Sequence, residues 1–227
     1  MAISEPSEVD RSAQAVRARV TEIRQRRGRV TISFDSALPL ECDRSFELAS
    51  HLAVGDNVSP QTLDRLRRCA AAHTAEAIAE KLLARRPRSE SELLTRLKQR
   101  GVQPVVAKEV VASLRERGLI NDAAFARYWA EERARARPRA ARMIRAELGA
   151  KGVEPAIAAA ATAQISDDEL ATQLASKAAQ RFQGNWPAYE RRGGAMLIRR
   201  GFSYEVARRA LRSAWESQEH TDCSDAR

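Results

Sequence analysis

A run of arginines between residues 133 and 145 is the group of side chains best suited to chemistry, and that chemistry is anion binding. A merely solvated helix face usually mixes charges of both signs, so that pairs form along it. Here like charges lie four residues apart, as at Arg133 and Arg137, which costs helix stability unless an anion relieves the repulsion. The sequence therefore predicts a basic patch of six arginines: Arg133, Arg135, Arg137, Arg139, Arg142 and Arg145.

Smaller basic clusters are secondary candidates, because each alone is typical of a soluble surface. They comprise Arg26, Arg27, Arg29, Arg191, Arg192, Arg199 and Arg200. The whole chain of 227 residues has 39 Lys+Arg against 30 Asp+Glu and a formal net charge of +9. This excess favours a nucleic acid, or a partner that carries one. No aromatic, Asn or Gln residue interrupts the arginine run, so we expect contacts to phosphates rather than to base edges.

Residues for catalysis or metal binding do not occur in useful patterns. The three cysteines contain no CxxC pair, and none of the three histidines belongs to an HExxH motif. No glycine-rich phosphate loop is present, because Gly193-Gly194 stands alone, and no serine or cysteine has the context of a nucleophile. We therefore expect no catalysis, no metal and no cofactor.

The distribution of apolar residues predicts a cytoplasmic protein. No apolar run approaches the roughly 20 residues that span a bilayer. The first ten residues carry acidic side chains where a signal peptide has a basic and then an apolar stretch. We expect no membrane association.

The N-terminal region is expected to contain a small β-structure. Residues 1–15 and 218–227 are polar without periodicity, which predicts disorder at both ends. Within residues 16–58, β-branched residues around a turn at 26–29 predict a β-hairpin with a basic tip. A short helix is expected over 43–52 and a loop over 54–58, and Ser59-Pro60 predicts the start of a long helix.

From about residue 73 the chain repeats itself. Gly101, Gly152 and Gly201 are spaced 51 and 49 residues apart. Each has a leucine four residues before it, a proline fourteen before it, and apolar residues one and five after it. These positions are Leu97, Leu148 and Leu197; Pro87, Pro138 and Pro187; Val102, Val153 and Phe202; Val106, Ile157 and Val206. Four columns in register across three copies indicate a tandem repeat.

The recurring prolines, glycines and helix caps predict three helices, A, B and C, in each unit. Proline is expected to open helix B, glycine to end it in a left-handed turn, and a second cap to open helix C. The fold class is therefore mainly α, with a linker helix and repeat 1 over 59–120, repeat 2 over 121–166 and repeat 3 over 167–217. Units this short stack on their neighbours, which predicts an elongated, curved solenoid.

Several side chains in the repeats are expected to be structural. Ser89-x-x-Glu92 forms a capping box that marks a helix start, and Asp122 is expected to cap helix A of the second unit. Phe125 and Trp129, four residues apart, are expected in the core rather than as platforms for bases. Glu147 and Lys151 have the spacing of a favourable ion pair.

Three sequence blocks carry a resemblance to a known family. Residues 88–97 (RSESELLTRL), 118–129 (GLINDAAFARYW) and 142–153 (RMIRAELGAKGV) resemble successive signatures of the RecX regulatory protein family. The resemblance runs from about residue 75 to 216. Arg137-Pro138 stands where the family commonly has a glycine-containing loop.

The resemblance implies a non-enzymatic modulator of the RecA recombinase. Such a protein binds as a monomer in the groove of the RecA–DNA filament and blocks filament extension, ATP hydrolysis and strand exchange in recombinational DNA repair. Its partners would be RecA and single- or double-stranded DNA, held through phosphates. Two alternatives stay open: a helical-repeat DNA-binding protein that acts without RecA, because helices B and C resemble a helix-turn-helix in outline, and a scaffold whose arginines are only solvated.

Overall fold

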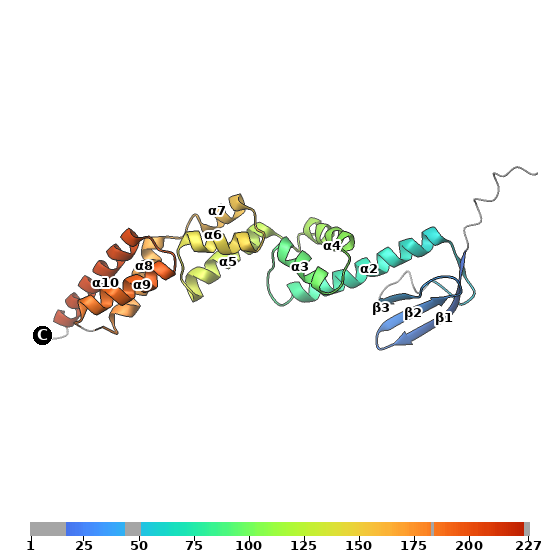
Figure 1. The fold of residues 1–227 in the computed structure, drawn as a ribbon, viewed down its shortest axis with the longest axis horizontal. Helices are drawn as coiled ribbons and strands as arrows, with labels where there is room; N and C mark the ends of the chain where they lie inside the picture. Colours follow the sequence, from blue (N-terminus) through green and yellow to red (C-terminus); the bar gives the residue numbers. More distant parts are fainter. Residues whose placement is uncertain (1–16, 44–50, 183, 225–227) are drawn as a thin grey trace, which may run out of the picture. The chain divides into compact units, whose positions relative to one another are not determined.

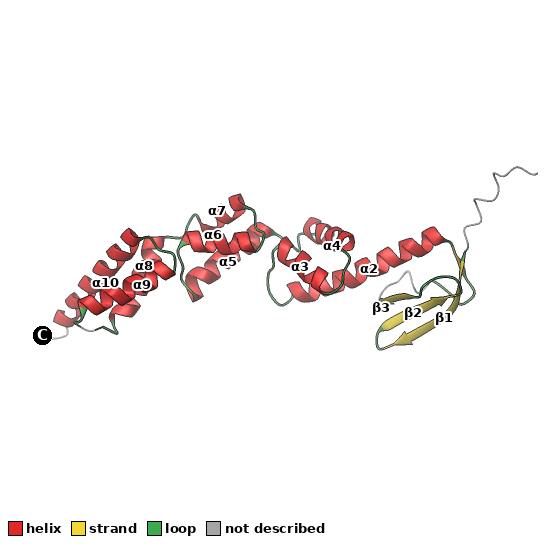
Figure 2. Ribbon diagram, in the orientation of Figure 1, coloured by secondary structure: helices red, strands yellow, loops and turns green. Residues whose placement is uncertain are grey.

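The protein is mainly α-helical, with a small sheet near its N-terminus (Figures 1 and 2). The computed structural model describes residues 17–43, 51–182 and 184–224, and these contain nine helices and four strands. They form two compact units. The first consists of the described residues of Met1–Arg86 together with Leu94–Glu116, and the second consists of those of Pro87–Leu93 and Arg117–Arg227.

The first unit contains a four-stranded antiparallel sheet in the order β3-β2-β1-β4. The predicted hairpin is confirmed by strands β1 (Ala18–Arg26) and β2 (Arg29–Phe34). Its two turn residues, Arg27 and Gly28, both have positive φ, at 47° and 81°. This conformation suits a two-residue hairpin because its twist matches that of the strands.

Two further strands replace elements that were predicted differently. Strand β3 (Leu40–Asp43) includes the first residue of the expected short helix, and β4 (Asn57–Val58) occupies the end of the expected loop. In β3, Leu40 and Cys42 are buried while Glu41 and Asp43 are exposed. This alternation has the period of a strand. Of the expected helix, residues 51 and 52 are not helical and residues 44–50 lie outside the described residues.

The sheet packs on the long helix α2 (Pro60–Leu83), whose start is capped by Ser59 as expected. The Ser59 hydroxyl accepts a hydrogen bond from the Thr62 amide at 3.1 Å. Buried side chains of both elements form one apolar core: Val20, Ile32, Leu40, Leu63, Leu66 and Ala70. The C-terminal half of α2 packs against α4 (Pro104–Glu116), so the same helix supports the sheet and serves as helix A of the first repeat.

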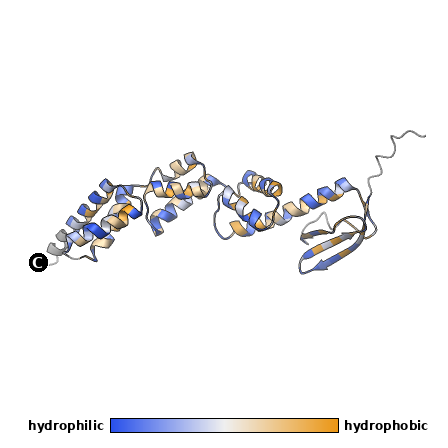
Figure 3. Ribbon diagram, viewed as in Figure 1, coloured by the Kyte–Doolittle hydropathy of each residue, from blue (hydrophilic) through white to orange (hydrophobic). Residues whose placement is uncertain are grey.

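The three predicted repeats are confirmed as nine consecutive helices of the described chain. The first contains α2, α3 (Glu90–Gln99) and α4; the second contains α5 (Asp122–Ala136), α6 (Ala141–Ala150) and α7 (Pro155–Thr162). The third contains α8 (Asp167–Ala179), α9 (Trp186–Arg199) and α10 (Tyr204–Ser224). Hydrophilic and hydrophobic residues are interspersed along the helices, as amphipathic packing requires (Figure 3). None of the described helices is long and apolar enough to cross a bilayer.

Each helix B ends in the same glycine turn, which explains three of the sequence columns. Gly101, Gly152 and Gly201 have φ values of 81°, 75° and 94°. The amide of the residue after each glycine donates to the carbonyl of the leucine that lies four residues before that glycine. These bonds measure 3.1, 3.1 and 3.2 Å in the first, second and third repeats. This is the Schellman pattern, in which the apolar residue after the glycine packs near the leucine. All three leucines are fully buried.

The prolines have a different position from the one expected. Pro187 lies in the first turn of α9, but Pro87 and Pro138 each precede their helix by three residues. The expectation that proline opens helix B is therefore right only in the third repeat. Ser89 caps α3 instead, with its hydroxyl accepting from the Glu92 amide at 3.1 Å.

The C-terminal tail also differs from expectation. Helix α10 continues to Ser224, where disorder was predicted from residue 218. Neither glycine nor proline occurs between Tyr204 and Ser224, so nothing in the backbone ends the helix earlier. The expected disorder of residues 1–15, and of the last three residues of the tail, lies outside the described residues.

The third repeat packs an aromatic cluster around Tyr189 and brings α9 close to α10. The buried Tyr189 hydroxyl donates to the Ala175 carbonyl at 3.1 Å, and burial raises the pKa of Tyr189 to about 12. Its ring centroid lies 5.4 Å from that of Trp215 and 5.8 Å from that of Trp186. A Cβ on Gly193 would lie 2.7 Å from Cδ2 of Leu211, so the absence of a side chain there leaves room for Leu211 beside this cluster.

Within the second unit, the start of one helix B meets the glycine turn that ends the next helix B. The Ser89 hydroxyl donates to the Lys151 carbonyl at 2.6 Å, and the Ala140 amide donates to the Arg200 carbonyl at 3.1 Å. A Cβ on Gly152 would lie 2.3 Å from the Ser91 Cβ. We call this arrangement the B–B joint. The capping box at Ser89 is therefore more than a helix start.

Aspartates from the next helix A complete the joint. The Asp122 carboxylate accepts from the Glu90 amide at 2.9 Å, and the Asp167 carboxylate accepts from the Ala141 amide at 2.7 Å. Asp122 therefore does not cap its own helix, which corrects the prediction. Asn121 caps α5, with its side-chain oxygen accepting from the Ala124 amide at 2.9 Å.

Replacing the joint glycine with alanine is expected to destabilise the protein more than the same change at an open turn. Gly101→Ala meets no atom within 4 Å, so it should cost about 1 kcal/mol for the left-handed backbone alone. Gly152→Ala adds the clash with Ser91 and should cost about 3 kcal/mol. Urea denaturation followed by circular dichroism measures both, and equal losses would contradict the role of the joint.

Candidate functional site

The six arginines of the predicted patch surround the connection between α5 and α6. Arg133 and Arg135 lie in the last turn of α5, and Arg137 is its C-terminal cap residue. Arg139 lies in the connection, while Arg142 and Arg145 lie on α6. The structure therefore brings them to one region, but their side chains have different partners.

Two of the six bind the same carboxylate, that of Glu147. Nε of Arg133 donates to Oε2 of Glu147 at 2.6 Å, and Nη1 of Arg139 donates to Oε1 at 2.7 Å. Nε1 of Trp129 also donates to Oε2 of Glu147, at 3.0 Å. The Glu147 side chain is only 18% exposed. The repulsion expected between Arg133 and Arg137 is therefore relieved within the protein, on the Arg133 side, without an external anion.

The ring of Trp129 is covered by cations rather than open to a base. The Arg133 guanidinium lies 4.3 Å and the Lys151 ammonium 4.2 Å from its ring centroid. The ring also packs against Phe125, with centroids 5.9 Å apart. Lys151 lies 3.9 Å from the Glu92 carboxylate, so the expected pair with Glu147 is replaced by other partners for both side chains.

Two basic side chains stabilise the B–B joint between the second and third repeats. Nε of Arg142 donates to the Gly201 carbonyl, and Nη1 of Arg200 donates to the Pro138 carbonyl at 3.0 Å. Each of these bonds ties the second repeat to the third. The primary candidate Arg142 and the secondary candidate Arg200 therefore have structural roles that the local sequence did not indicate.

The other three arginines of the patch are exposed. Arg135 pairs with Glu132 at 2.5 Å with a side chain 79% exposed, and this partner raises the pKa of Arg135. Nη1 of Arg145 lies 3.3 Å from the Thr162 hydroxyl. Within the part of the chain that the structure describes, no hydrogen bond or ion pair is found for the Arg137 side chain. Among the described residues, Arg137 and Arg145 have no carboxylate partner, whereas Arg135 presents an exposed ion pair with Glu132.

The secondary candidates other than Arg200 are exposed, and those on α9 do not gather in one place. Arg26, Arg27 and Arg29 lie at the hairpin tip, where Arg29 is 3.7 Å from Glu41. Neighbours in the sequence separate on α9: Arg191 lines a groove beside α10, whereas Arg192 lines a groove beside α8. Arg199 is exposed on the same helix.

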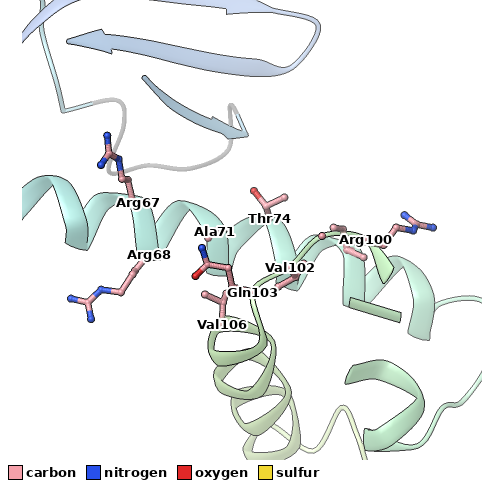
Figure 4. Close-up of a pocket in the computed structure, with 10 residues that line it drawn as sticks. Arg67, Arg68, Ala71, Thr74, Arg100, Val102, Gln103 and Val106 are labelled. Atoms are coloured by element: carbon pink, nitrogen blue, oxygen red, sulfur yellow. The ribbon is translucent and has the colours of Figure 1, made fainter. Parts of the chain in front are cut away.

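An open groove of about 340 Å³ lies in the first unit between α2 and the start of α4. Figure 4 shows Arg67 and Arg68 leaving α2 in different directions, with the Arg100 guanidinium extending away from both. Nη2 of Arg67 donates to the Leu38 carbonyl at 2.6 Å. These cations do not converge, so the groove does not form an anion site. Among the described residues, no group of three or more His, Cys, Asp or Glu side chains is placed to hold a metal ion.

The order of the three helical units is matched by known protein domains. Residues 75–114 match "RecX, first three-helix domain", residues 121–161 match the second such domain, and residues 166–211 match the third. Together these segments cover more than half of the chain.

The chain belongs to the RecX family.

Curated RecX proteins share this sequence over most of their own length. The chain is 36% identical over 148 residues to the "Regulatory protein RecX" of Streptomyces coelicolor, covering 63% of this chain and 79% of that protein. It is 39% identical over 143 residues to the protein of the same name from Chromohalobacter salexigens, covering 61% and 91%. These relatives are named as regulatory proteins.

Solved RecX structures share the fold. A structure described as "Crystal structure of regulatory protein RecX" has a TM-score of 0.61 and 23% identity, covering 83% of this chain and 96% of that one. RecX from Lactobacillus salivarius has a TM-score of 0.57 and 21% identity, covering 63% and 96%. The RecX domain matches begin at residue 75, so the sheet and residues 60–74 of α2 precede them.

Glu147→Gln is expected to lower the free energy of unfolding by about 2–3 kcal/mol, because two partly buried guanidinium groups would lose their counter-charge. Urea denaturation followed by tryptophan fluorescence measures this, since Trp129 contacts Glu147 directly. The control Glu132→Gln removes an exposed pair and should cost less than about 1 kcal/mol. Equal effects of the two variants would show that Glu147 does not organise the α5–α6 connection.

Proposed function

We propose that this RecX protein is a non-enzymatic regulator that binds RecA–DNA filaments and reduces their extension, ATP hydrolysis and strand exchange. The observation that carries the proposal is the set of three consecutive RecX domains, because the relatives that share them are named regulatory proteins. RecA as the partner is what the resemblance to the family implies.

The exposed arginines of the second repeat are the proposed contact surface. Arg135, Arg137 and Arg145 carry charge outward, whereas Arg133 and Arg139 are bound to Glu147 and Arg142 to the Gly201 carbonyl. We therefore assign the first three to contacts with phosphate or acidic RecA surface, and the other three to positioning the α5–α6 connection. Contact through charge also predicts sensitivity to salt.

The second candidate is a DNA-binding protein that acts without RecA. It is favoured by the short glycine turn between helices B and C, which resembles a helix-turn-helix in outline. In that case the same arginines would bind phosphates of bare DNA. The two candidates differ in whether RecA is required.

Single-stranded-DNA-dependent ATP hydrolysis by RecA from the same organism separates the two candidates. Substoichiometric amounts of the protein are expected to reduce the rate, because a regulator bound to a filament affects many RecA subunits. If the rate is unchanged while the protein still binds bare DNA, the RecA proposal fails and the second candidate survives.

Reversing two exposed charges is expected to weaken filament binding about tenfold. Arg137→Glu with Arg145→Glu replaces attraction by repulsion, and the structure gives neither side chain a role in holding the joint. Co-sedimentation with RecA–DNA filaments measures the affinity, and the control Lys98→Glu with Lys108→Glu changes the net charge equally on exposed positions of the first repeat. Unaltered binding of the first variant would place the contact elsewhere.

A further inference from the structure

A basic groove in the third repeat lies outside the predicted patch. It is an open hollow of about 300 Å³ between α8 and α9. Its apolar surface is formed by Leu174, Ala178, Phe182, Gly193 and Met196. Leu174, Phe182 and Met196 are only half-buried, so an apolar group of a ligand could pack against them.

Four cations border this groove, and none of its lining residues is acidic. Lys177 lies in the last turn of α8 and Arg181 follows the end of that helix, whereas Arg192 and Arg200 lie on the α9 side. The latter two are eight residues apart, or about 12 Å along the helix axis. The groove is thus flanked by positive charge on both sides.

These cations differ from those of the second repeat in lacking counter-charges. Lys177, Arg181 and Arg192 are exposed, and no ion pair or hydrogen bond of their side chains is found within the described parts of the chain. Arg133 and Arg139, by contrast, share the Glu147 carboxylate. Like charges gathered around one hollow repel each other, most strongly at low ionic strength. An anion in the groove would relieve that repulsion.

The polar groups of the groove identify the kind of anion. Every polar side chain that lines it is a lysine or an arginine, and these side chains only donate hydrogen bonds. A peptide segment would bring amide donors that need acceptors, which these side chains do not offer. A phosphodiester backbone presents acceptors only, and an unpaired base has an apolar face that suits the half-buried surface.

We propose that the α8–α9 groove binds the backbone of single-stranded DNA. Phosphates would contact Lys177, Arg181 and Arg192, with a base against Phe182 and Met196. This inference deepens the proposed function and rests on it only for the choice of DNA as the nucleic acid. Arg200 is assigned a supporting role, because its guanidinium already binds the Pro138 carbonyl.

A triple variant tests the groove without RecA. Lys177→Gln, Arg181→Gln and Arg192→Gln remove three exposed charges and leave the joint contact of Arg200 intact. Binding of fluorescein-labelled oligothymidylate is followed by fluorescence anisotropy over a series of NaCl concentrations. Each lost phosphate contact makes the negative slope of log affinity against log salt shallower by about 0.7, so the triple variant should have a slope shallower by about 2. Its affinity at low salt should be at least roughly tenfold lower than that of the wild type.

Two controls separate the groove from net charge. Lys98→Gln, Lys108→Gln and Arg127→Gln remove the same charge from exposed positions that line none of the grooves described above, and should leave the slope near that of the wild type. Lys177→Arg, Arg181→Lys and Arg192→Lys keep the charge and should retain most of the binding. Unlabelled duplex of the same length should compete less well than the single strand, because its bases are stacked. Circular dichroism checks that the triple variant folds. If it does not, Arg192→Gln replaces it in the test and should make the slope shallower by about 0.7.

Several results would overturn the proposal. A groove variant that binds oligothymidylate like the wild type excludes the groove as a DNA site, and equal losses in the two charge-removing variants indicate diffuse attraction. If the groove variant binds DNA normally but no longer reduces RecA ATP hydrolysis, the groove takes an acidic protein segment instead. Because the binding assay contains no RecA, failure of the groove proposal is distinguishable from failure of the proposed function.

Discussion

The left-handed glycine turn at the end of helix B is the constraint on which the helical repeats depend. It reverses the chain within two residues, satisfies two carbonyls at the helix end and buries a leucine beneath the turn. Because Gly152 and Gly201 have no side chain, the start of the preceding helix B reaches their turns closely. Glycine is therefore needed at these two positions for two reasons. The backbone has a positive φ, and the neighbouring repeat leaves little room for a side chain.

In the second repeat, several charged side chains stabilise the structure and are therefore bound within the protein. Glu147 binds Arg133 and Arg139 and accepts from Trp129, which fixes the connection that presents the exposed arginines. In the third repeat the balance is reversed, because the groove beside α8 has cations without a neighbouring carboxylate. The number of arginines in a segment therefore does not indicate how much positive charge a partner can bind. That depends on whether a carboxylate lies close to each arginine.

The fold could be predicted from sequence wherever a local signal was strong, and the site could not. Glycines in register gave the repeats, and a glycine between β-branched runs gave the hairpin, because both depend on local backbone conformation. Strands β3 and β4 have only four and two residues, so the alternation in β3 is too short to distinguish a strand from a helix in the sequence. Both strands pair with the edges of the hairpin. Contacts such as Asp122 with Glu90, or Glu147 with Arg133, join residues 14–32 positions apart, which spacing alone does not reveal. Arg191 and Arg192 face different grooves for a similar reason: adjacent residues on a helix point about 100° apart.

The aspartate contacts give the array a direction. The first amide of α3 is satisfied by Asp122, and that of α6 by Asp167, each supplied by the helix that begins the following repeat. In α9, Asn185 accepts from the Ala188 amide, which corresponds to the bond between Ser89 and the Glu92 amide in α3. The first and second repeats are thus each completed by the helix that follows them in the chain. Loss of a following helix would consequently leave the first amide of α3 or of α6 without its carboxylate partner.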